Sequence, residues 1–184
     1  DFKRIQSLSS LQEHSIEKYY EDNSYTYLIA AGRLIKQKGF EMLIEALALT
    51  NNSKIKLAIL GHGPLEENLI ALIEKYKLQE TVSLIGYKKN PYAWISKANA
   101  FVLSSHYEGF PNVVLEALSC GTPVISTPAP GGTKEILESI EGCYLSKEIS
   151  AESLEQAISS FLNSKYQCIS ENTVNPYKPE KICE

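Results

Sequence analysis

Short apolar runs alternate with amphipathic segments along most of this chain. The apolar runs predict strands buried on both faces, and they cover residues 25–31, 54–60, 81–86, 100–105, 122–127 and 143–146. The intervening segments carry apolar residues at helical spacing and predict helices over residues 38–50, 63–77, 91–98, 112–120, 133–139 and 150–163. Pro64 is expected in the first turn of its helix, Gly121 as a C-cap, and Ser150 at an N-cap.

This alternation predicts an α/β fold with a Rossmann-like, doubly wound parallel sheet of about six strands and helices on both faces. We assign residues 24–163 to that domain. Residues 1–23 form a lead-in, in which Ile5, Leu8, Leu11 and Ile16 predict one weak amphipathic helix. Residues 164–184 form a polar tail, interrupted by proline, for which another helical turn or two is expected near its end.

The composition narrows the class of protein. The 184 residues suffice for one domain with a good core, and the net charge of −4 does not suit a nucleic-acid surface. No apolar run reaches membrane-spanning length and no signal peptide opens the chain. Because the chain starts at Asp1 and holds one methionine, Met42, we expect a fragment or a processed product. The four cysteines are scattered, which favours a reducing cytoplasm over a zinc site.

Two loops at predicted strand ends carry candidate ligand contacts, because ligands of parallel sheets bind at the carboxyl ends of the strands. The first, 32–39, begins at Gly32 and carries Arg33 and Lys38, two cations that suit a diphosphate, although a solvated turn would look the same. The second, "GHGP" at 61–64, lacks the third glycine of a dinucleotide fingerprint, which disfavours a dehydrogenase. It fits a glycine turn and a ligand contact equally well, and His62 is interpreted as an ordinary polar loop residue.

Two glutamates mark the richest stretch, "HYEGFPNVVLEALSCGTPVIS" at 106–126. Pro111 or Asn112 opens a helix whose amino end is a natural anion site. Glu116 lies inside the apolar run 113–118, where an ionised carboxylate is costly unless it faces water or has a partner such as ribose hydroxyls. Glu108 could hold a second hydroxylated group or could be a surface acid.

Several stretches together resemble the nucleotide-sugar-binding half of family 4 retaining glycosyltransferases, which have the two-domain GT-B architecture. The resemblance covers roughly residues 25–163 and rests on these segments: "GRLIKQKGFEMLIEAL", "LAILGHGPLEENL", "VSLIGYKKNPYAWISKANAFVLSSHYEGFPNVVLEALSCGTPVIST" and "GGTKEIL". The spacing E-x(7)-E from Glu108 to Glu116, followed by G-T-P-V-I, is its most specific element.

The resemblance implies a role for each matching residue. Arg33 and Lys38 would hold the donor diphosphate, Glu108 the donor sugar, and Glu116 the ribose hydroxyls. The remaining donor contacts would come from Gly32, Gly61, Tyr87, Lys88, Gly109, Phe110, Pro111, Asn112 and Val113. Glu108, Arg33 and Lys38 are the predicted catalytic residues, and whether Glu108 reacts or only positions the sugar stays open. From the residues alone, Tyr87 and Lys88 either border a base or face water.

The resemblance also implies the reaction and the partners. It implies retention, giving an α-linkage, with a UDP-hexose or UDP-N-acetylhexosamine as donor in bacterial surface-polysaccharide synthesis. Neither metal nor cofactor is expected, since the only aspartates, Asp1 and Asp22, form no Asp-x-Asp motif. A glycan or lipid-linked saccharide acceptor would bind an N-terminal domain outside this chain, with contact at the inner membrane face left open. The tail 164–184, with "NPYKPEKICE", resembles the start of the last helix of the family, which returns to that domain. The chain alone is expected to bind nucleotide without transferring sugar.

Two alternatives remain at this point. A nucleotide-sugar epimerase of GT-B fold would use similar phosphate and ribose contacts for a different reaction. A non-catalytic binding module on a doubly wound fold would lack nucleotide affinity.

Overall fold

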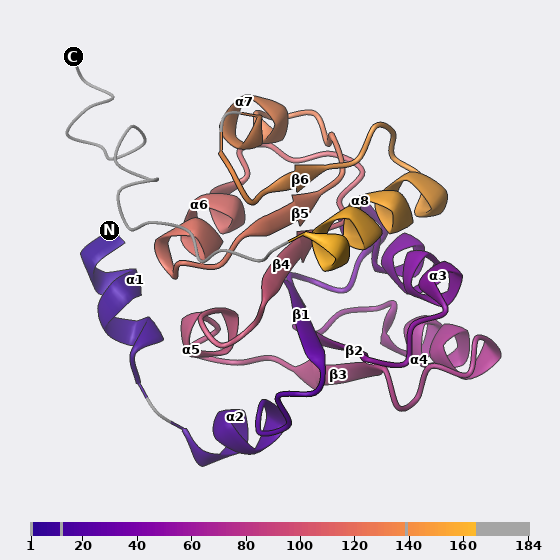
Figure 1. Cartoon of the computed structure of the whole chain (residues 1–184), viewed down its shortest axis with the longest axis horizontal. Helices are drawn as coiled ribbons and strands as arrows, with labels where there is room; N and C mark the ends of the chain where they lie inside the picture. Colours follow the sequence, from indigo (N-terminus) through magenta and orange to yellow (C-terminus); the bar gives the residue numbers. More distant parts are fainter. Residues whose placement is uncertain (1, 12, 139, 165–184) are drawn as a thin grey trace.

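The computed structural model describes residues 2–11, 13–138 and 140–164, and its centre is one sheet of six parallel strands (Figure 1). The strands lie in the order β3-β2-β1-β4-β5-β6. Their bounds are β1 Thr26–Ala31, β2 Ile55–Leu60, β3 Val82–Gly86, β4 Ala100–Leu103, β5 Val124–Ser126 and β6 Tyr144–Leu145. This is the strand order of the doubly wound Rossmann fold. The predicted fold class is therefore confirmed.

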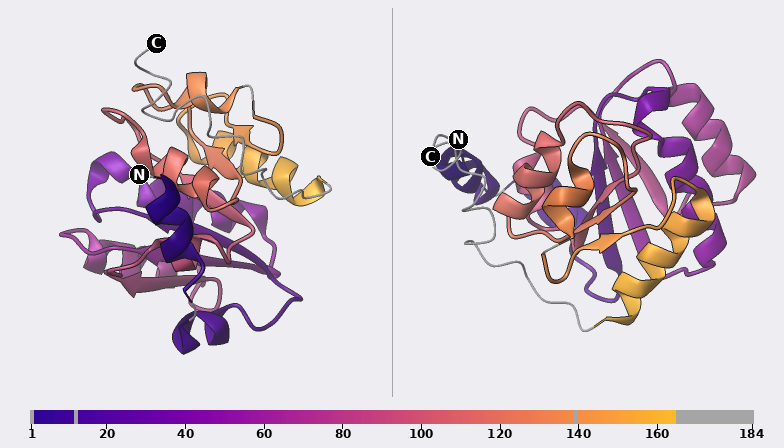
Figure 2. Two further views of the ribbon diagram at one scale, coloured as in Figure 1. Left: turned by 90° about the vertical axis from the view of Figure 1, so that its left-hand side faces the viewer. Right: turned by 90° about the horizontal axis from the view of Figure 1, so that it is seen from above.

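Helices cover both faces of the sheet (Figure 2). One face packs against α3 (Phe40–Thr50), α4 (Glu66–Lys75) and α8 (Ala151–Asn163). The other packs against α2 (His14–Tyr19), α5 (Tyr92–Ile95), α6 (Asn112–Ser119) and α7 (Thr133–Leu137). Successive residues of the central strand β1 serve opposite layers, Leu28 in one core cluster and Ile29 in the other, and both are fully buried. Burial on both sides explains why the strands read as continuous apolar runs.

The lead-in forms two helices, so the prediction of one amphipathic helix was wrong. Helix α1 (Phe2–Ser9) ends well before α2 begins, and Glu13 at the N-cap of α2 has extended backbone angles that break the helical path. Helix α1 packs on α5 and α6, where the Asn90 Nδ2 amide donates to the Leu8 carbonyl at 2.9 Å. Ile5 and Ile16 are buried, as the spacing implied, whereas Leu11 between the helices is 53% exposed.

The predicted caps were correct in two of three places. Ser150 caps α8 by accepting a hydrogen bond from the Ser153 N–H at 3.1 Å, and Gly121 follows α6 with a φ of 77°. Pro64 was wrongly placed, because α4 begins two residues later. The Leu65 N–H bonds instead to the Leu34 carbonyl at 3.1 Å, which holds this segment against the neighbouring loop.

The helix start predicted within residues 164–184 lies outside the described residues, apart from Ser164. The domain bounds given above stay a prediction. Across the described parts of the chain, none of the helices has the length and apolar character needed to cross a membrane.

Candidate active site

The loops after β1 and β2 are fastened together at the carboxyl edge of the sheet. The Leu34 N–H donates to the His62 carbonyl at 3.1 Å. Gly61 approaches the other loop so closely that a Cβ atom would lie 1.9 Å from the Gly32 carbonyl oxygen. Real Cβ atoms are not found so close to an oxygen, so this contact requires glycine. The "GHGP" turn therefore has a packing role, whichever ligand it also meets.

A pocket of about 380 Å³ opens at this edge of the sheet. It is lined by Ala31, Gly32, Arg33, Leu60, Gly61, His62, Tyr87, Lys88 and Pro91. Five of these nine are residues that the sequence marked as donor contacts, drawn from the loops after three different strands. The Tyr87 side chain is exposed and meets the His62 ring nearly at right angles, with the ring centroids 5.8 Å apart.

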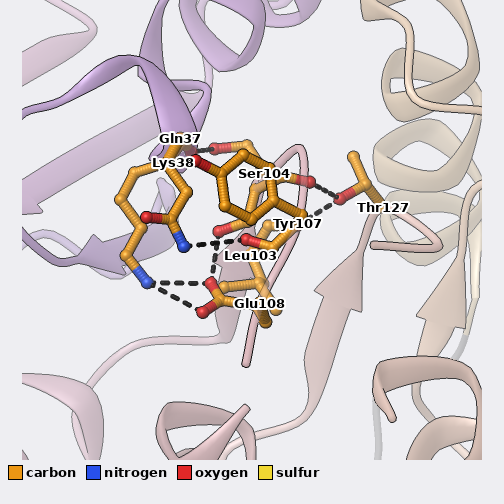
Figure 3. A network of polar contacts seen from close by, with 8 residues as sticks. Gln37, Lys38, Leu103, Ser104, Tyr107, Glu108 and Thr127 are labelled. Atoms are coloured by element: carbon orange, nitrogen blue, oxygen red, sulfur yellow. Dashed lines mark hydrogen bonds and ion pairs between the residues drawn. The ribbon is translucent and has the colours of Figure 1, made fainter. Parts of the chain in front are cut away.

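Lys38 connects this pocket to Glu108. It ends the 3-10 turn η1 (Lys36–Lys38), and its aliphatic stem lies against Gly32, where a Cβ atom would be 3.4 Å from the stem carbons. Its Nζ donates to both carboxylate oxygens of Glu108, at 2.8 and 3.1 Å (Figure 3). The Glu108 side chain is 7% exposed and that of Lys38 is 20% exposed. The pair is thus largely shielded from water, which strengthens the attraction.

Polar contacts from neighbouring loops fix this ion pair (Figure 3). The backbone carbonyl of Gln37 accepts a hydrogen bond from the His106 N–H at 2.8 Å. The side-chain amide of Gln37 donates a second hydrogen bond to the Tyr107 carbonyl at 3.0 Å. The hydroxyl of Ser104 donates to the Lys38 carbonyl at 2.8 Å. The loops after β1 and β4 are consequently held side by side, so that Lys38 and Glu108 meet.

The loop after β5 supports Glu108 from the other side. The Glu108 N–H donates to the Pro130 carbonyl at 2.8 Å. Gly131 lies so close that a Cβ atom there would be 2.2 Å from the Glu108 carbonyl oxygen. These contacts hold the backbone of Glu108 against the loop after β5.

Helix α6 begins four residues after Glu108. Pro111 is its N-cap and Asn112 its first residue, as predicted, and the preceding Gly109 and Phe110 are exposed. The amino end of a helix favours anions because its dipole is positive there. In α6 the Asn112 and Val114 N–H groups already donate to the Phe110 and Pro111 carbonyls. The loop from Glu108 to Val113 therefore combines a fixed carboxylate with an anion-favouring helix end.

Glu116 lies on the half-buried side of α6 and is not among the residues that line the pocket. Burial raises the pKa of its carboxyl above the ordinary value, and interaction with the Tyr92 hydroxyl partly offsets this rise. Burial and the Glu116 carboxylate together raise the pKa of the Cys120 thiol to about 12. The apolar surroundings that the sequence implied for Glu116 are real, and Tyr92 is its partner in this structure.

Sequence reasoning missed several residues of the site. His62 was interpreted as an ordinary loop residue, yet it lines the pocket, together with the unpredicted Ala31, Leu60 and Pro91. Ser105 and Tyr92 were also missed, although each contacts one of the two glutamates. The available signal was position, because Ser105 ends the predicted strand 100–105, two residues beyond the end of β4, and Tyr92 follows Pro91 at a helix start. Within the described residues, no group of three or more His, Cys, Asp or Glu side chains could hold a metal ion.

The sequence is similar to known glycosyltransferases. The profile of the family described as "Glycosyl transferases group 1" matches residues 12–177. An uncharacterized glycosyltransferase of Methanocaldococcus jannaschii is 42% identical over 138 residues, which cover 72% of this chain and 34% of that protein. A Campylobacter jejuni enzyme, named as an N-acetylgalactosamine-N,N'-diacetylbacillosaminyl-diphospho-undecaprenol 4-alpha-N-acetylgalactosaminyltransferase, is 39% identical over 110 residues, covering 60% of this chain and 30% of that one.

The fold also has close counterparts among solved structures. Anabaena HepE, in complex with UDP and glucose, superposes with a TM-score of 0.78 at 22% identity, covering 91% of this chain and 48% of that one. WaaG, a glycosyltransferase of lipopolysaccharide biosynthesis, superposes with a TM-score of 0.72 at 18% identity, covering 94% and 48%. The fold of this chain therefore corresponds to about half of each of these two structures.

The six-stranded parallel sheet with helices on both faces is a Rossmann-like domain of the GT-B class. The chain belongs to the glycosyl transferases group 1 family. It spans about a third of the length of the curated relatives it matches and about half of the solved structures.

Proposed function

We propose that this chain is the donor-binding part, residues 24–163, of a retaining glycosyltransferase that uses a UDP-sugar. One observation carries the proposal. The stem of Lys38 borders the pocket at Gly32, while its amine pairs with Glu108 at 2.8 Å. A ligand with a base, a diphosphate and a sugar has its parts in that order, which matches the order of pocket, cation and carboxylate.

The parts of the donor are assigned to the residues accordingly. The base and ribose occupy the pocket and its rim, with Glu116 accepting the ribose hydroxyls. Arg33, Lys38 and the amino end of α6 bind the diphosphate. Glu108 accepts a hydroxyl of the sugar, helped by the loop that ends at Val113. UDP is the preferred nucleotide of this proposal because solved relatives of the same fold, such as HepE, bind UDP.

The chemistry that these groups support is departure of a nucleoside diphosphate. The bond between the anomeric carbon and the phosphate oxygen breaks, and its electron pair leaves with UDP. The acceptor oxygen forms the new bond to the anomeric carbon, and its proton passes to the departing phosphate oxygen. Fixed cations and a helix amino end stabilise the negative charge that develops on UDP in the transition state. Arg33 and Lys38 would do here what a metal held by Asp-x-Asp does elsewhere, and we propose a metal-independent reaction with retention and an α-linkage.

The remaining partners follow from the relatives. The Campylobacter enzyme is named for transfer to a diphospho-undecaprenol-linked saccharide, and other relatives are named for polysaccharide biosynthesis. We propose a glycan or lipid-linked acceptor, a hexose or N-acetylhexosamine as the transferred sugar, and action in the cytoplasm at the inner face of the membrane. The acceptor site would belong to a further domain, so this chain alone would bind donor without transferring sugar.

Calorimetric titration tests the proposal directly. The 184-residue chain is titrated with UDP, GDP and ADP, each with and without EDTA. We expect saturable binding that favours UDP and does not change with EDTA. Absence of binding by all three nucleotides, in this chain and in the longer protein that contains it, would refute the proposal.

Arg33→Ala is expected to weaken UDP binding by roughly tenfold or more while changing uridine binding less than threefold. Arg33 lines the pocket, and loss of a charge-assisted contact to phosphate costs about 1.5–3 kcal/mol. Lys36→Ala is the matched control, because Lys36 is an exposed cation in the same loop that does not line the pocket. An equal loss for UDP and uridine would count against a phosphate contact at Arg33.

Glu116→Gln is expected to weaken UDP binding by roughly tenfold or more at neutral pH, because an amide accepts ribose hydroxyls less well than a carboxylate. The folded protein raises the pKa of Glu116 above the ordinary value of 4.5. Ionised Glu116 therefore lowers the free energy of unfolding above the raised pKa, and this loss of stability disappears as the pH falls below 4.5. Protonation of Glu116 also removes the carboxylate that accepts the ribose hydroxyls. The UDP affinity of wild type should therefore approach that of Glu116→Gln as the pH falls toward the raised pKa.

UDP affinity is measured calorimetrically for wild type and Glu116→Gln from pH 8 to pH 5. Protonation of the UDP phosphate affects both proteins equally, so it cancels in the ratio of the two affinities. Glu135→Gln, at an exposed residue of α7, is the control for a general charge effect. A ratio near one at every pH would show that Glu116 does not contact the nucleotide.

A further inference from the structure

Ser105 is a buried residue whose hydroxyl touches the Glu108 carboxylate. It is 0% exposed, and its Oγ donates to Glu108 Oε1 at 2.5 Å. Hydrogen bonds from hydroxyl to carboxylate are the strong, charge-assisted kind. Nothing assigned so far to the donor site uses this hydroxyl.

Ser105 is itself held in place. Its carbonyl accepts a hydrogen bond from Thr127 Oγ1 at 2.7 Å, and Thr127 is 0% exposed at the end of the neighbouring strand β5. Figure 3 shows Thr127 reaching across to this loop. The Thr127 N–H also donates to the Leu103 carbonyl at 2.9 Å. The hydroxyl of Ser105 is therefore presented to Glu108 from a rigid strand end.

The two oxygens of Glu108 differ in their contacts. Oε1 receives the Ser105 hydroxyl and the closer bond from Lys38. Within the part of the chain that the structure describes, Oε2 receives only the longer Lys38 bond of 3.1 Å. If Lys38 turns toward a bound diphosphate, Ser105 still fixes Oε1. Oε2 then loses its Lys38 bond and is available to another donor.

We propose that Ser105 is a positioning residue, which fixes Glu108 so that its second oxygen accepts a hydroxyl of the donor sugar while Lys38 binds the diphosphate. This inference rests on the proposed function, because it takes Glu108 as the sugar contact. Ser105 does not touch the nucleotide. Its contribution should therefore appear only when the ligand carries a sugar.

The test compares UDP with UDP-sugars. Dissociation constants for UDP, UDP-glucose, UDP-galactose, UDP-N-acetylglucosamine and UDP-N-acetylgalactosamine are measured for the wild-type chain, and the tightest UDP-sugar is kept as probe. For Ser105→Ala we expect the affinity for that probe to fall about five- to tenfold. The affinity for UDP should stay within twofold of wild type.

The control is Ser119→Ala. Ser119 is a buried serine of α6 whose hydroxyl donates to the Leu115 carbonyl at 2.6 Å, away from Glu108. It should change stability without changing the ratio of the two affinities. Equal loss of UDP and UDP-sugar binding in Ser105→Ala would overturn the positioning role, and so would unchanged UDP-sugar binding.

A second measurement does not need a ligand. In a double-mutant cycle of thermal unfolding, the shift caused by Ser105→Ala should fall by more than half when Glu108 is already glutamine. Additive shifts would overturn the proposed contact between Ser105 and Glu108 even if the chain binds nucleotides.

The outcomes for the two proposals are distinguishable. If wild type binds no nucleotide, the proposed function fails on that result alone, and the double-mutant cycle still tests the contact between Ser105 and Glu108. If the sugar adds nothing to UDP affinity in wild type, the positioning proposal is overturned while UDP binding stands.

Discussion

Lys38→Met is expected to lower the free energy of unfolding by about 2–3 kcal/mol and to weaken UDP binding by roughly 30-fold or more. The stability loss arises because Glu108, only 7% exposed, would keep a charge without its cation. The value lies between those of buried and exposed pairs because Lys38 is 20% exposed. Chemical denaturation measures the first effect and calorimetric titration the second.

The matched control separates the two roles of Lys38. In the double variant Lys38→Met/Glu108→Gln, no unpaired charge remains, so most of the lost stability should return. UDP binding should stay weak, because the phosphate contact is still absent. Recovery of UDP affinity together with stability would mean that Lys38 acts only on the fold. A single variant as stable as wild type would show that the ion pair contributes nothing.

Gly61→Ala is expected to destabilise the chain by roughly 3–5 kcal/mol and to abolish measurable UDP binding. Its φ of 137° suits glycine alone, and the added Cβ would lie 1.9 Å from the Gly32 carbonyl oxygen. The contact is between two backbones, so no side-chain rotation relieves it. The loops after β1 and β2 would separate, and both of them line the pocket.

Gly86→Ala is the control for this change. Gly86 ends the adjacent strand β3 and also has a positive φ, of 76°, but an added Cβ would meet nothing within 4 Å. Its substitution should therefore cost only the backbone strain, about 1–2 kcal/mol. If Gly61→Ala costs no more than Gly86→Ala in denaturation experiments, the close approach of the two loops does not limit stability.

The architecture could be predicted because the parallel sheet is buried on both faces. Each strand of such a sheet reads as an apolar run, and each connecting helix shows one apolar stripe, so local patterns suffice. The single predicted lead-in helix failed for the opposite reason. The prediction that Ile5 and Ile16 are buried was correct. The break between the two helices was not predicted, because no local sequence pattern indicates the extended backbone at Glu13.

The candidate site was only partly readable. Lys38 and Glu108 were found because charged residues at the carboxyl ends of parallel strands converge on one edge. That the two form an ion pair at 2.8 Å could not be found, since they lie 70 residues apart in the chain. Ser105 and Tyr92 were missed because a serine or tyrosine in a loop is common, and only its neighbours in space give it a role.

By itself the sequence determined the layer architecture and the doubly wound type of sheet. It also determined which loops carry the cations and Glu108, and which helix carries Glu116. These depend on local periodicity and on residue chemistry. Only the tertiary structure decided that Glu108 is shielded with Lys38 and Ser105, that Gly61 must be glycine against Gly32, and that Glu116 faces Tyr92 with a raised pKa. These properties depend on distances between loops that are remote in the chain, and such distances are set when the whole sheet assembles.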